Sequence, residues 1–355
     1  MKNVCYAILL CCSSAALSQG LQAPIQPDGT VAIPAFSLPY SNYASPESKQ
    51  RLIEHQAMDW ELEEAWKGGI AATRKAYDEK MFLPLIARQN ARYRVDSHPE
   101  TIGGIYTEVF VPSAGIAPRN RNRVLINLHG GAFVLGARTN GRVESIPIAA
   151  TAGIKVISVD YRQAPEYTFP AASEDVAAVY RQLLKHYPPR NIGIYGCSSG
   201  GMLTGEAVAW FQKEKLPRPG AIGLFCSSTN GLADGDSQQL ADRLTGTLDE
   251  LPARNPPRLD DRYFKGASPT DPLAIPSVSR AVLAQFPPTL FITGTRAVEL
   301  SGAVRSQVDL ALLGVDARIF IWDGMSHGFF NDPDLPESRE AYKIIADFFD
   351  SHLGM

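Results

Sequence analysis

The chain has 355 residues, of which 45% are hydrophobic, so it is long enough for one large α/β domain or two smaller ones around a sizeable core. Its 34 basic and 37 acidic residues leave a net charge of −3, which argues against nucleic acid or an anionic membrane surface as partner. Three of the five cysteines lie in the first twelve residues, so no disulfide framework is expected. Cys197 and Cys226 are predicted to be buried free thiols, with a disulfide between them as the alternative.

The first twenty residues have the pattern of a secretory signal peptide. Lys2 provides a positive start, an apolar stretch runs from Val4 to Leu17, and Ala16-Leu17-Ser18 is a small-x-small cleavage site. The stretch is too short and wrongly flanked to span a membrane. We therefore predict a secreted or periplasmic protein, with a lipoprotein anchor at Cys11 or Cys12 as the alternative.

Two helices are predicted before the first strand. Ser45-Pro46-Glu47 is typical of an N-cap followed by proline at the first helical position. Apolar residues then recur at helical spacing: Leu52, Ile53, Met58, Leu62 and Trp66 in the first helix, and Ile70, Tyr77 and Met81 in the second. We interpret this stripe as packing, with the lining of a ligand pocket as the alternative. The two helices are expected to form a layer added to the sheet.

Strands and helices alternate along the rest of the chain. Tyr93 to Phe110, with a turn at Gly103-Gly104, predict a hairpin. Further strands are predicted at 124–128, 156–159, 192–195, 222–225, 290–293 and 319–322, and helices at 172–186, 199–213, 301–313 and 338–353. This alternation predicts a mostly parallel sheet covered on both faces, with a ligand site at the carboxyl ends of its strands. One insertion before the strand at 290, with a short helix at 237–244, is typical of a lid.

The stretch from Asn191 to Gly201 indicates a nucleophile. An apolar strand ends at Gly196, Gly196-Cys197-Ser198-Ser199-Gly200 fits G-x-S-x-G, and a helical pattern follows. In this order of strand, turn and helix, the turn exposes a serine at the tip of a sheet. Gly196 and Gly200 have no side chain, so the strand and the helix can approach closely. Ser198 is therefore the candidate nucleophile, and a plain Gly/Ser-rich turn is the alternative.

Two other segments offer the groups that a serine nucleophile needs. The glycine-rich turn after the strand at 124–128 can direct backbone N–H groups at one spot, as a negatively charged oxygen requires. The candidate oxyanion hole consists of the N–H groups of Gly130, Gly131, Ala132 and Ser199. His129 is expected to orient this turn. His327 follows a late strand and is the candidate base.

Four ordered motifs resemble the hormone-sensitive-lipase-like family of bacterial esterases. They are His129 to Phe133, Asp160 to Glu166 with Phe169 to Ala172, the G-x-S-x-G turn, and Gly324 to Phe329. The resemblance covers the chain from about residue 40 and implies an α/β-hydrolase fold with a mostly parallel eight-stranded sheet, flanking helices and a helical cap. It also implies hydrolysis of short- to medium-chain esters without a cofactor or metal. After the signal peptide at 1–20, the predicted domains are N-terminal cap helices at 24–88, a catalytic core at 89–227 and 283–355, and a cap insertion at 228–282.

The chain departs from the family pattern at the catalytic acid. The family has Gly-Thr-Arg-Asp after the seventh strand, whereas this chain has Gly294-Thr295-Arg296-Ala297. A triad needs a third group that orients the histidine. Glu299 is the best substitute and Asp323 a second candidate, while a Ser–His dyad or an impaired enzyme stays open. A milder departure is Ala132 in place of the family's third glycine, which restricts the backbone.

The sequence therefore predicts a serine carboxylic-ester hydrolase that acts on a small-molecule ester through an acyl-enzyme. One alternative is a catalytically weak or dead ligand-binding protein of the same fold. Ala297 favours this alternative, because it stands where the family has its catalytic acid. Another is an amidase on the same fold, since the two differ in leaving group and not in nucleophile. Whether the chain forms a homodimer also stays open.

Overall fold

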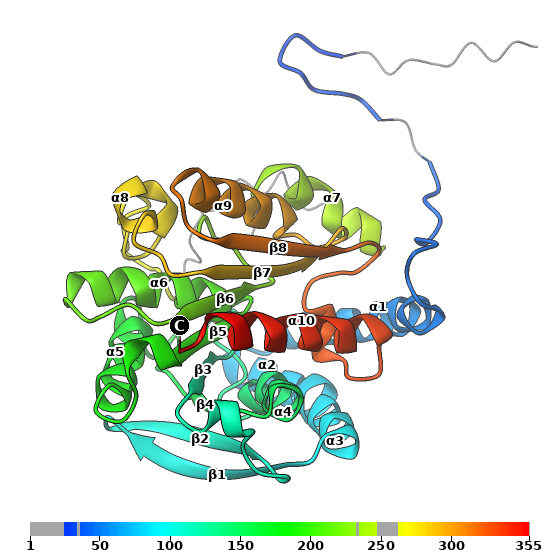
Figure 1. The fold of residues 1–355 in the computed structure, drawn as a ribbon. Coiled ribbons are helices and arrows are strands. Elements are labelled where there is room, and N and C mark those ends of the chain that lie inside the picture. Colours follow the sequence, from blue (N-terminus) through cyan, green and yellow to red (C-terminus); the bar gives the residue numbers. More distant parts are fainter. Residues whose placement is uncertain (1–24, 34–35, 232–233, 247–261, 355) are drawn as a thin grey trace, which may run out of the picture. The chain divides into compact units, whose positions relative to one another are not determined.

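The computed structural model describes residues 25–33, 36–231, 234–246 and 262–354 (Figure 1). The predicted signal peptide at 1–20 and residues 247–261 of the predicted cap insertion lie outside this range. The described residues before Tyr40 belong to a small unit in which Ile25 and Val31 pair across a turn. The second unit, residues 40–355, contains the sheet and its helices.

Eight strands form one sheet in the order β1-β2-β4-β3-β5-β6-β7-β8. The first two form an antiparallel hairpin, β2 pairs antiparallel with β4, and the remaining neighbours are parallel. This confirms the predicted mostly parallel eight-stranded sheet. The strands are β1 (Val95–Ile102), β2 (Ile105–Pro112), β3 (Val124–Leu128), β4 (Lys155–Val159), β5 (Ile192–Cys197), β6 (Ala221–Phe225), β7 (Thr289–Gly294) and β8 (Ala317–Trp322).

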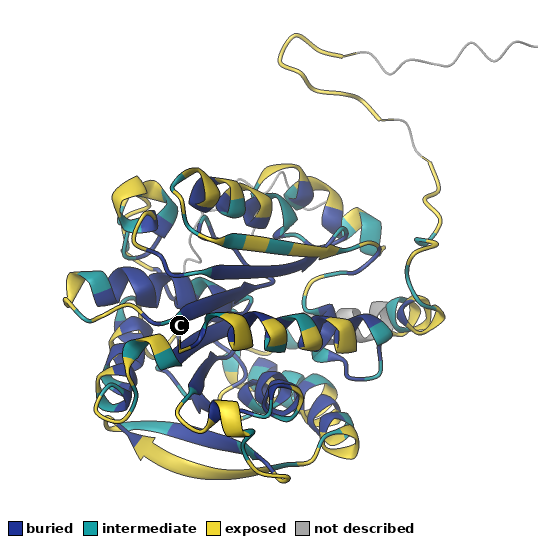
Figure 2. Cartoon of the chain, viewed as in Figure 1, coloured by how far each residue is buried: buried dark blue, intermediate teal, exposed yellow. Residues whose placement is uncertain are grey.

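Helices cover both faces of this sheet. Helix α4 (Asn140–Ala152) packs against α10 (Pro336–His352), and α5 (Ala171–Leu183) packs against α6 (Ser199–Lys213). In β5, a Cβ on Gly193 would meet Phe349 of α10, whereas a Cβ on Gly196 would meet Gly200 of α6. Residues 193 and 196 of a strand point to opposite faces of the sheet. The α4–α10 pair therefore covers one face, and the α5–α6 pair covers the other. The middle strands are buried, whereas the edge strand β1 is largely exposed and the other edge strand, β8, is partly exposed (Figure 2).

Helix α4 was not predicted, because it has no polar face. Ten of its thirteen residues are buried, and Pro147 lies inside it. A helix that is buried nearly all round lacks the apolar stripe with a period of 3.6 residues by which amphipathic helices are recognised. Helices α5, α6, α9 (Leu300–Leu312) and α10 lie where the sequence predicts them, and α8 (Arg280–Leu283) adds a single unpredicted turn.

The N-terminal helices of the second unit begin as predicted. The Ser45 hydroxyl caps α1 (Pro46–Lys67) by accepting a hydrogen bond from the Ser48 N–H at 3.1 Å. The predicted second helix is longer than expected: α2 (Ile70–Tyr77) continues through a π-helical turn (Asp78–Phe82) into α3 (Leu83–Arg92). The Glu337 carboxylate of α10 accepts a hydrogen bond from the Ser45 N–H at 2.7 Å, which ties the start of α1 to the core.

The insertion before β7 contains α7 (Gly235–Thr245), close to the short helix predicted there. The assignment of this insertion and of the N-terminal helices to a cap stays a prediction. Cys197 and Cys226 are buried and free, which confirms the prediction for these two thiols. Within the described ranges, none of the helices has the length and apolar character that crossing a bilayer requires.

Candidate active site

Ser198 lies at a sharp turn between β5 and α6. Its backbone has φ 58° and ψ −125°, a combination that L-residues rarely adopt and that costs about 1–3 kcal/mol. The Ser198 N–H donates to the Phe225 carbonyl at 2.9 Å, which fixes the turn to the end of β6. The serine lines a cavity at the carboxyl ends of the parallel strands, as the motif predicts.

The two glycines of the motif allow this turn by leaving space for another backbone. A Cβ on Gly196 would lie 2.1 Å from the Leu128 carbonyl oxygen, and a Cβ on Gly200 would lie 1.8 Å from the same atom. Both distances are far below a van der Waals contact. Only glycine therefore lets α6 start directly against β3 and β5 at this point.

Gly200→Ala is expected to destabilise the fold by about 3 kcal/mol or more, because the methyl group collides with a main-chain oxygen that cannot move away alone. Gly205→Ala, in the same helix, is the matched control. A Cβ there has its nearest neighbours at 3.7 Å, and alanine is favoured over glycine in a helix by about 1 kcal/mol. Urea unfolding of both variants measures the difference. Equal stability of the two would contradict the close approach described here.

The glycine-rich turn after β3 has the strained backbone that directs N–H groups to one side. Gly131 has φ 124° and Ala132 φ 53°, so alanine occupies a left-handed conformation at a cost of about 1–2 kcal/mol. Hydrogen bonds from Val134 and Leu135 to the Gly131 carbonyl, at 2.9 and 2.8 Å, hold the turn. Within the described chain, the N–H groups of Gly131, Ala132 and Ser199 have no hydrogen-bond partner.

Gly130 differs from the other three candidates. Its N–H donates to the buried Glu144 carboxylate at 2.8 Å and is therefore not available to an oxyanion. The expectation for Gly130 was wrong, because the acceptor comes from the unpredicted helix α4. The side-chain amides of Asn127 and Asn140 also donate to Glu144, at 2.8 and 3.2 Å. Burial raises the pKa of Glu144 to about 8, against the effect of these donors.

His129 is buried beneath the same turn. Its ring stacks on Tyr161 with 4.6 Å between centroids, and the Tyr161 hydroxyl donates to the His129 carbonyl at 2.6 Å. The Nδ1–H of His129 donates to the Gly130 carbonyl at 2.7 Å. These contacts support the prediction that His129 orients the loop.

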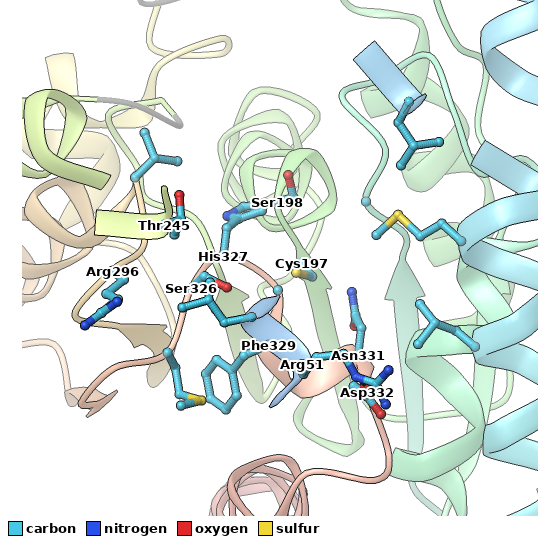
Figure 3. A pocket seen from close by; sticks show the side chains of 18 of the residues that line it. Arg51, Cys197, Ser198, Thr245, Arg296, Ser326, His327, Phe329, Asn331 and Asp332 are labelled. Carbon is cyan, nitrogen blue, oxygen red and sulfur yellow. Dashed lines mark ion pairs between the residues drawn. The ribbon is translucent and has the colours of Figure 1, made fainter. Parts of the chain in front are cut away.

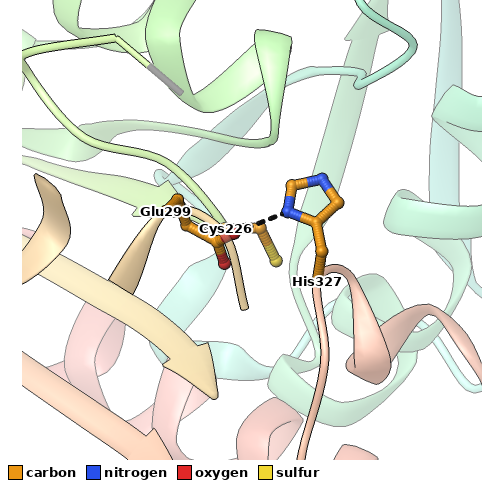
Figure 4. Close-up of side chains that lie close together, drawn as sticks. All are labelled: Cys226, Glu299 and His327. Carbon is orange, nitrogen blue, oxygen red and sulfur yellow. Dashed lines mark hydrogen bonds and ion pairs between the residues drawn. The ribbon is translucent and has the colours of Figure 1, made fainter. Parts of the chain in front are cut away.

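His327 and Glu299 form a hydrogen-bonded pair (Figure 4). The Nδ1–H of His327 donates to Glu299 Oε2 at 2.8 Å, and the other carboxylate oxygen accepts from the Thr293 hydroxyl at 2.9 Å. The Glu299 side chain is fully buried, whereas that of His327 is 35% exposed. Loss of water around the imidazole lowers its pKa, but the charge and hydrogen bond of Glu299 outweigh this and raise the pKa of His327 above its ordinary value.

The other acid candidate lies elsewhere. Asp323 accepts hydrogen bonds from the hydroxyls of Ser41 and Thr295 and does not contact His327. Ala297 is buried in the turn that leads from β7 to Glu299, the residue just before α9. The sequence alone could not choose among these acids, because the choice depends on the course of that turn.

Ser198 and His327 share one cavity of about 460 Å³ (Figure 3). Gly131 and Ala132 also line it. Its apolar wall comes largely from the N-terminal helices and includes Leu62, Trp66, Tyr77, Met81, Phe82 and Leu85. The stripe that we interpreted as packing thus contributes several side chains to the pocket, and the alternative interpretation is correct for them. Helical spacing identifies an apolar face but not what that face covers.

Comparison with known proteins agrees with this fold. The chain matches the alpha/beta hydrolase fold family over residues 125–331, more than half of its length. It belongs to this family. The resemblance to bacterial hormone-sensitive-lipase-like esterases is confirmed by a solved structure of an esterase from that family, with a TM-score of 0.68, 26% identity and coverage of 88% of this chain and 100% of that one.

Particular relatives share much of the chain. An acetyl-hydrolase of Streptomyces hygroscopicus is 31% identical over 239 residues, which cover 66% of this chain and 78% of that protein. Esterase LipU of Mycobacterium tuberculosis is 29% identical over 69% of this chain and 83% of its own length. The crystal structure of esterase E25 superposes with a TM-score of 0.77 at 28% identity and covers 91% of this chain and 99% of that one.

Proposed function

We propose that this protein is a serine carboxylic-ester hydrolase that works through an acyl-enzyme. The observation that carries the proposal is the 2.8 Å contact between His327 Nδ1 and Glu299, at a cavity that Ser198 and His327 both line. The named esterase and acetyl-hydrolase relatives support hydrolysis of carboxylic esters. The intact carboxylate partner of the histidine argues against a dead hydrolase fold.

Each residue has a distinct role in this mechanism. The Glu299 carboxylate keeps the proton on Nδ1 of His327, so Nε2 is free to take the proton from the Ser198 hydroxyl as its oxygen attacks the ester carbonyl. The N–H groups of Gly131, Ala132 and Ser199 stabilise the negative oxygen of the tetrahedral intermediate. His327 then protonates the departing alcohol. In the second half of the reaction, His327 takes a proton from water as the water attacks the acyl-enzyme, and it returns this proton to the Ser198 oxygen as the acid leaves.

We propose short- to medium-chain acyl esters as substrates. A cavity of about 460 Å³ is in the range that holds a small ligand, and its wall of Trp66, Met81 and neighbouring apolar side chains suits an aliphatic acyl chain. Contacts along that chain would be made equally in the ground state and the transition state, so they mainly lower KM.

The test of this proposal is acyl release from nitrophenyl acetate, butyrate, octanoate and palmitate by the purified chain. We expect a burst of nitrophenol close to one equivalent of protein, followed by slower turnover, because nitrophenol is a good leaving group and acylation should be faster than deacylation. We expect kcat/KM to be high for the shorter esters and to fall sharply for palmitate. The matching nitroanilide should react far more slowly. Hydrolysis without a burst would contradict the accumulating acyl-enzyme, and a faster nitroanilide would indicate an amidase.

The acid limb of activity should lie at a higher pH than the ordinary pKa of histidine. Only neutral His327 accepts a proton, and Glu299 raises its pKa, so activity is lost as pH falls through this raised value. Glu299→Gln removes the negative charge and should move the limb of its residual activity to lower pH. The measurement is kcat/KM against pH for both proteins. A limb that stays in place in the variant would show that Glu299 does not set this pKa.

A further inference from the structure

Cys226 places a third metal-binding side chain beside the His327–Glu299 pair (Figure 4). Its sulfur, a carboxylate oxygen of Glu299 and an imidazole nitrogen of His327 all lie within 4.8 Å of one another. The cysteine directly follows β6, and its N–H donates to the Ile292 carbonyl of β7 at 2.8 Å. The thiol takes no part in the proposed hydrolysis, so that mechanism does not explain why a cysteine lies beside the His327–Glu299 pair.

The donor set fits zinc. Thiolate, imidazole and carboxylate are the three ligand types that zinc binds in proteins, and three protein ligands with one water make a common open site. With Zn–S of about 2.3 Å and Zn–N of about 2.0 Å, ligand atoms in a tetrahedral site lie about 3.5 Å apart. The distances within the cluster must therefore shorten by about 1.3 Å at most. The His327 side chain is partly exposed at the cavity, and its ring can make most of this movement.

We propose that Cys226, Glu299 and His327 form an inhibitory site for zinc and similar thiophilic divalent cations. The cation enters from the cavity, and binding releases the Cys226 thiol proton to solvent. Inhibition follows from the imidazole tautomer. A metal on Nδ1 uses the lone pair of that nitrogen, so the single N–H of the neutral ring sits on Nε2. Nε2 then cannot accept the Ser198 proton.

The proposal predicts selectivity among cations. Mg²⁺ and Ca²⁺ prefer oxygen ligands in larger coordination shells and bind thiolate and imidazole poorly. Glu299 alone offers oxygen in this cluster, and the Thr293 hydroxyl already donates to one of its two oxygens. Zn²⁺ and Co²⁺ should therefore bind here, and Mg²⁺ should not.

Binding is tested without any activity, by cobalt absorption spectroscopy. Adding Co²⁺ to the parent protein should produce a near-ultraviolet thiolate-to-cobalt charge-transfer band. Cys226→Ala should lack the band. Cys197→Ala is the matched control. Cys197 is the other buried thiol of the described chain and contacts the Cys226 thiol, but it is not one of the three clustered ligands, so this variant should keep the band. Absence of the band in the parent, its survival in Cys226→Ala or its loss in Cys197→Ala would overturn the site.

A second variant covers the case in which Cys226→Ala does not fold. His327→Ala changes a partly exposed side chain and should fold. Its zinc affinity, measured by competition with a chromophoric chelator, should fall at least about tenfold, or about 1.4 kcal/mol. An unchanged affinity would exclude His327 as a ligand.

The inhibition rests on the proposed esterase function, and its failure is distinguishable from failure of the site. Each variant is compared with its own zinc-free rate. Zn²⁺ should inhibit the parent reversibly, with recovery on adding EDTA, and Cys226→Ala should need at least about ten times more zinc. Equal inhibition of the two, or equal inhibition by Mg²⁺, would contradict the proposal. A cobalt band in a protein that has no esterase activity would keep the site and reject the function.

Discussion

Ser198→Ala is expected to lower kcat for nitrophenyl butyrate by about six orders of magnitude, as loss of the nucleophile does in serine proteases. Without the hydroxyl no acyl-enzyme can form, and the burst of nitrophenol should disappear completely. The residual rate reflects what the oxyanion donors and substrate binding contribute to direct attack by water. The measurement is single-turnover and steady-state kinetics at one pH, with the thermal unfolding midpoint as a check of folding.

The neighbouring hydroxyl provides the control. Ser199 is 2% exposed, and in the proposed mechanism it acts through its backbone N–H, which Ser199→Ala retains. We expect this variant to keep the burst and to lose at most about tenfold in kcat. If Ser198→Ala kept the burst and Ser199→Ala lost it, the nucleophile would be misassigned. If the parent released no more product than Ser198→Ala, the protein would not be an esterase.

Glu299→Gln is expected to lower kcat by about four orders of magnitude, with little change in KM. The amide can hydrogen-bond to His327, but it carries no negative charge to stabilise the imidazolium, and its NH₂ group favours the wrong tautomer. The loss should therefore appear in the chemical step and not in substrate binding. Single-turnover acylation rates measure it directly. A variant with parental activity would show that Glu299 is not the acid.

Two other variants test the other positions that the sequence offers for the catalytic acid. Asp323→Asn removes a carboxylate that hydrogen-bonds to Ser41 and Thr295, so its effect on kcat should be within about tenfold. Ala297→Asp restores the family residue, but Nδ1 of His327 already has a partner. We expect no gain from it in the parent. A large gain would mean that the acid position had been vacant.

The chain thus keeps a carboxylate beside the histidine although the usual aspartate position is an alanine. Glutamate is one methylene longer than aspartate, and Glu299 lies two residues further along the turn between β7 and α9. The Thr293 hydroxyl at the end of β7 holds its second oxygen. The longer side chain of Glu299 offsets its later position in the turn, so its carboxylate still reaches Nδ1 of His327.

The sequence by itself determined most of the fold, because the responsible patterns are local. Each of these patterns can be read from residues that are neighbours along the chain. They are the apolar runs of strand length, the glycines around Ser198 and the proline after Ser45. The order of Ser198 and His327 likewise points to their roles without any coordinates. Helix α4 escaped prediction for the same reason, since a helix that is buried nearly all round leaves no local pattern.

Only the tertiary structure decided which groups meet. Glu299 contacts His327, which lies 28 positions further along the chain, Glu144 accepts a hydrogen bond from the Gly130 N–H, and Trp66 and Met81 line the cavity beside Ser198. None of these contacts follows from periodicity or spacing. A hydrogen bond depends on a few tenths of an ångström in the course of turns that are far apart in sequence. The sequence thus indicated the candidates for nucleophile and base, and the folded chain showed which carboxylate contacts the candidate base.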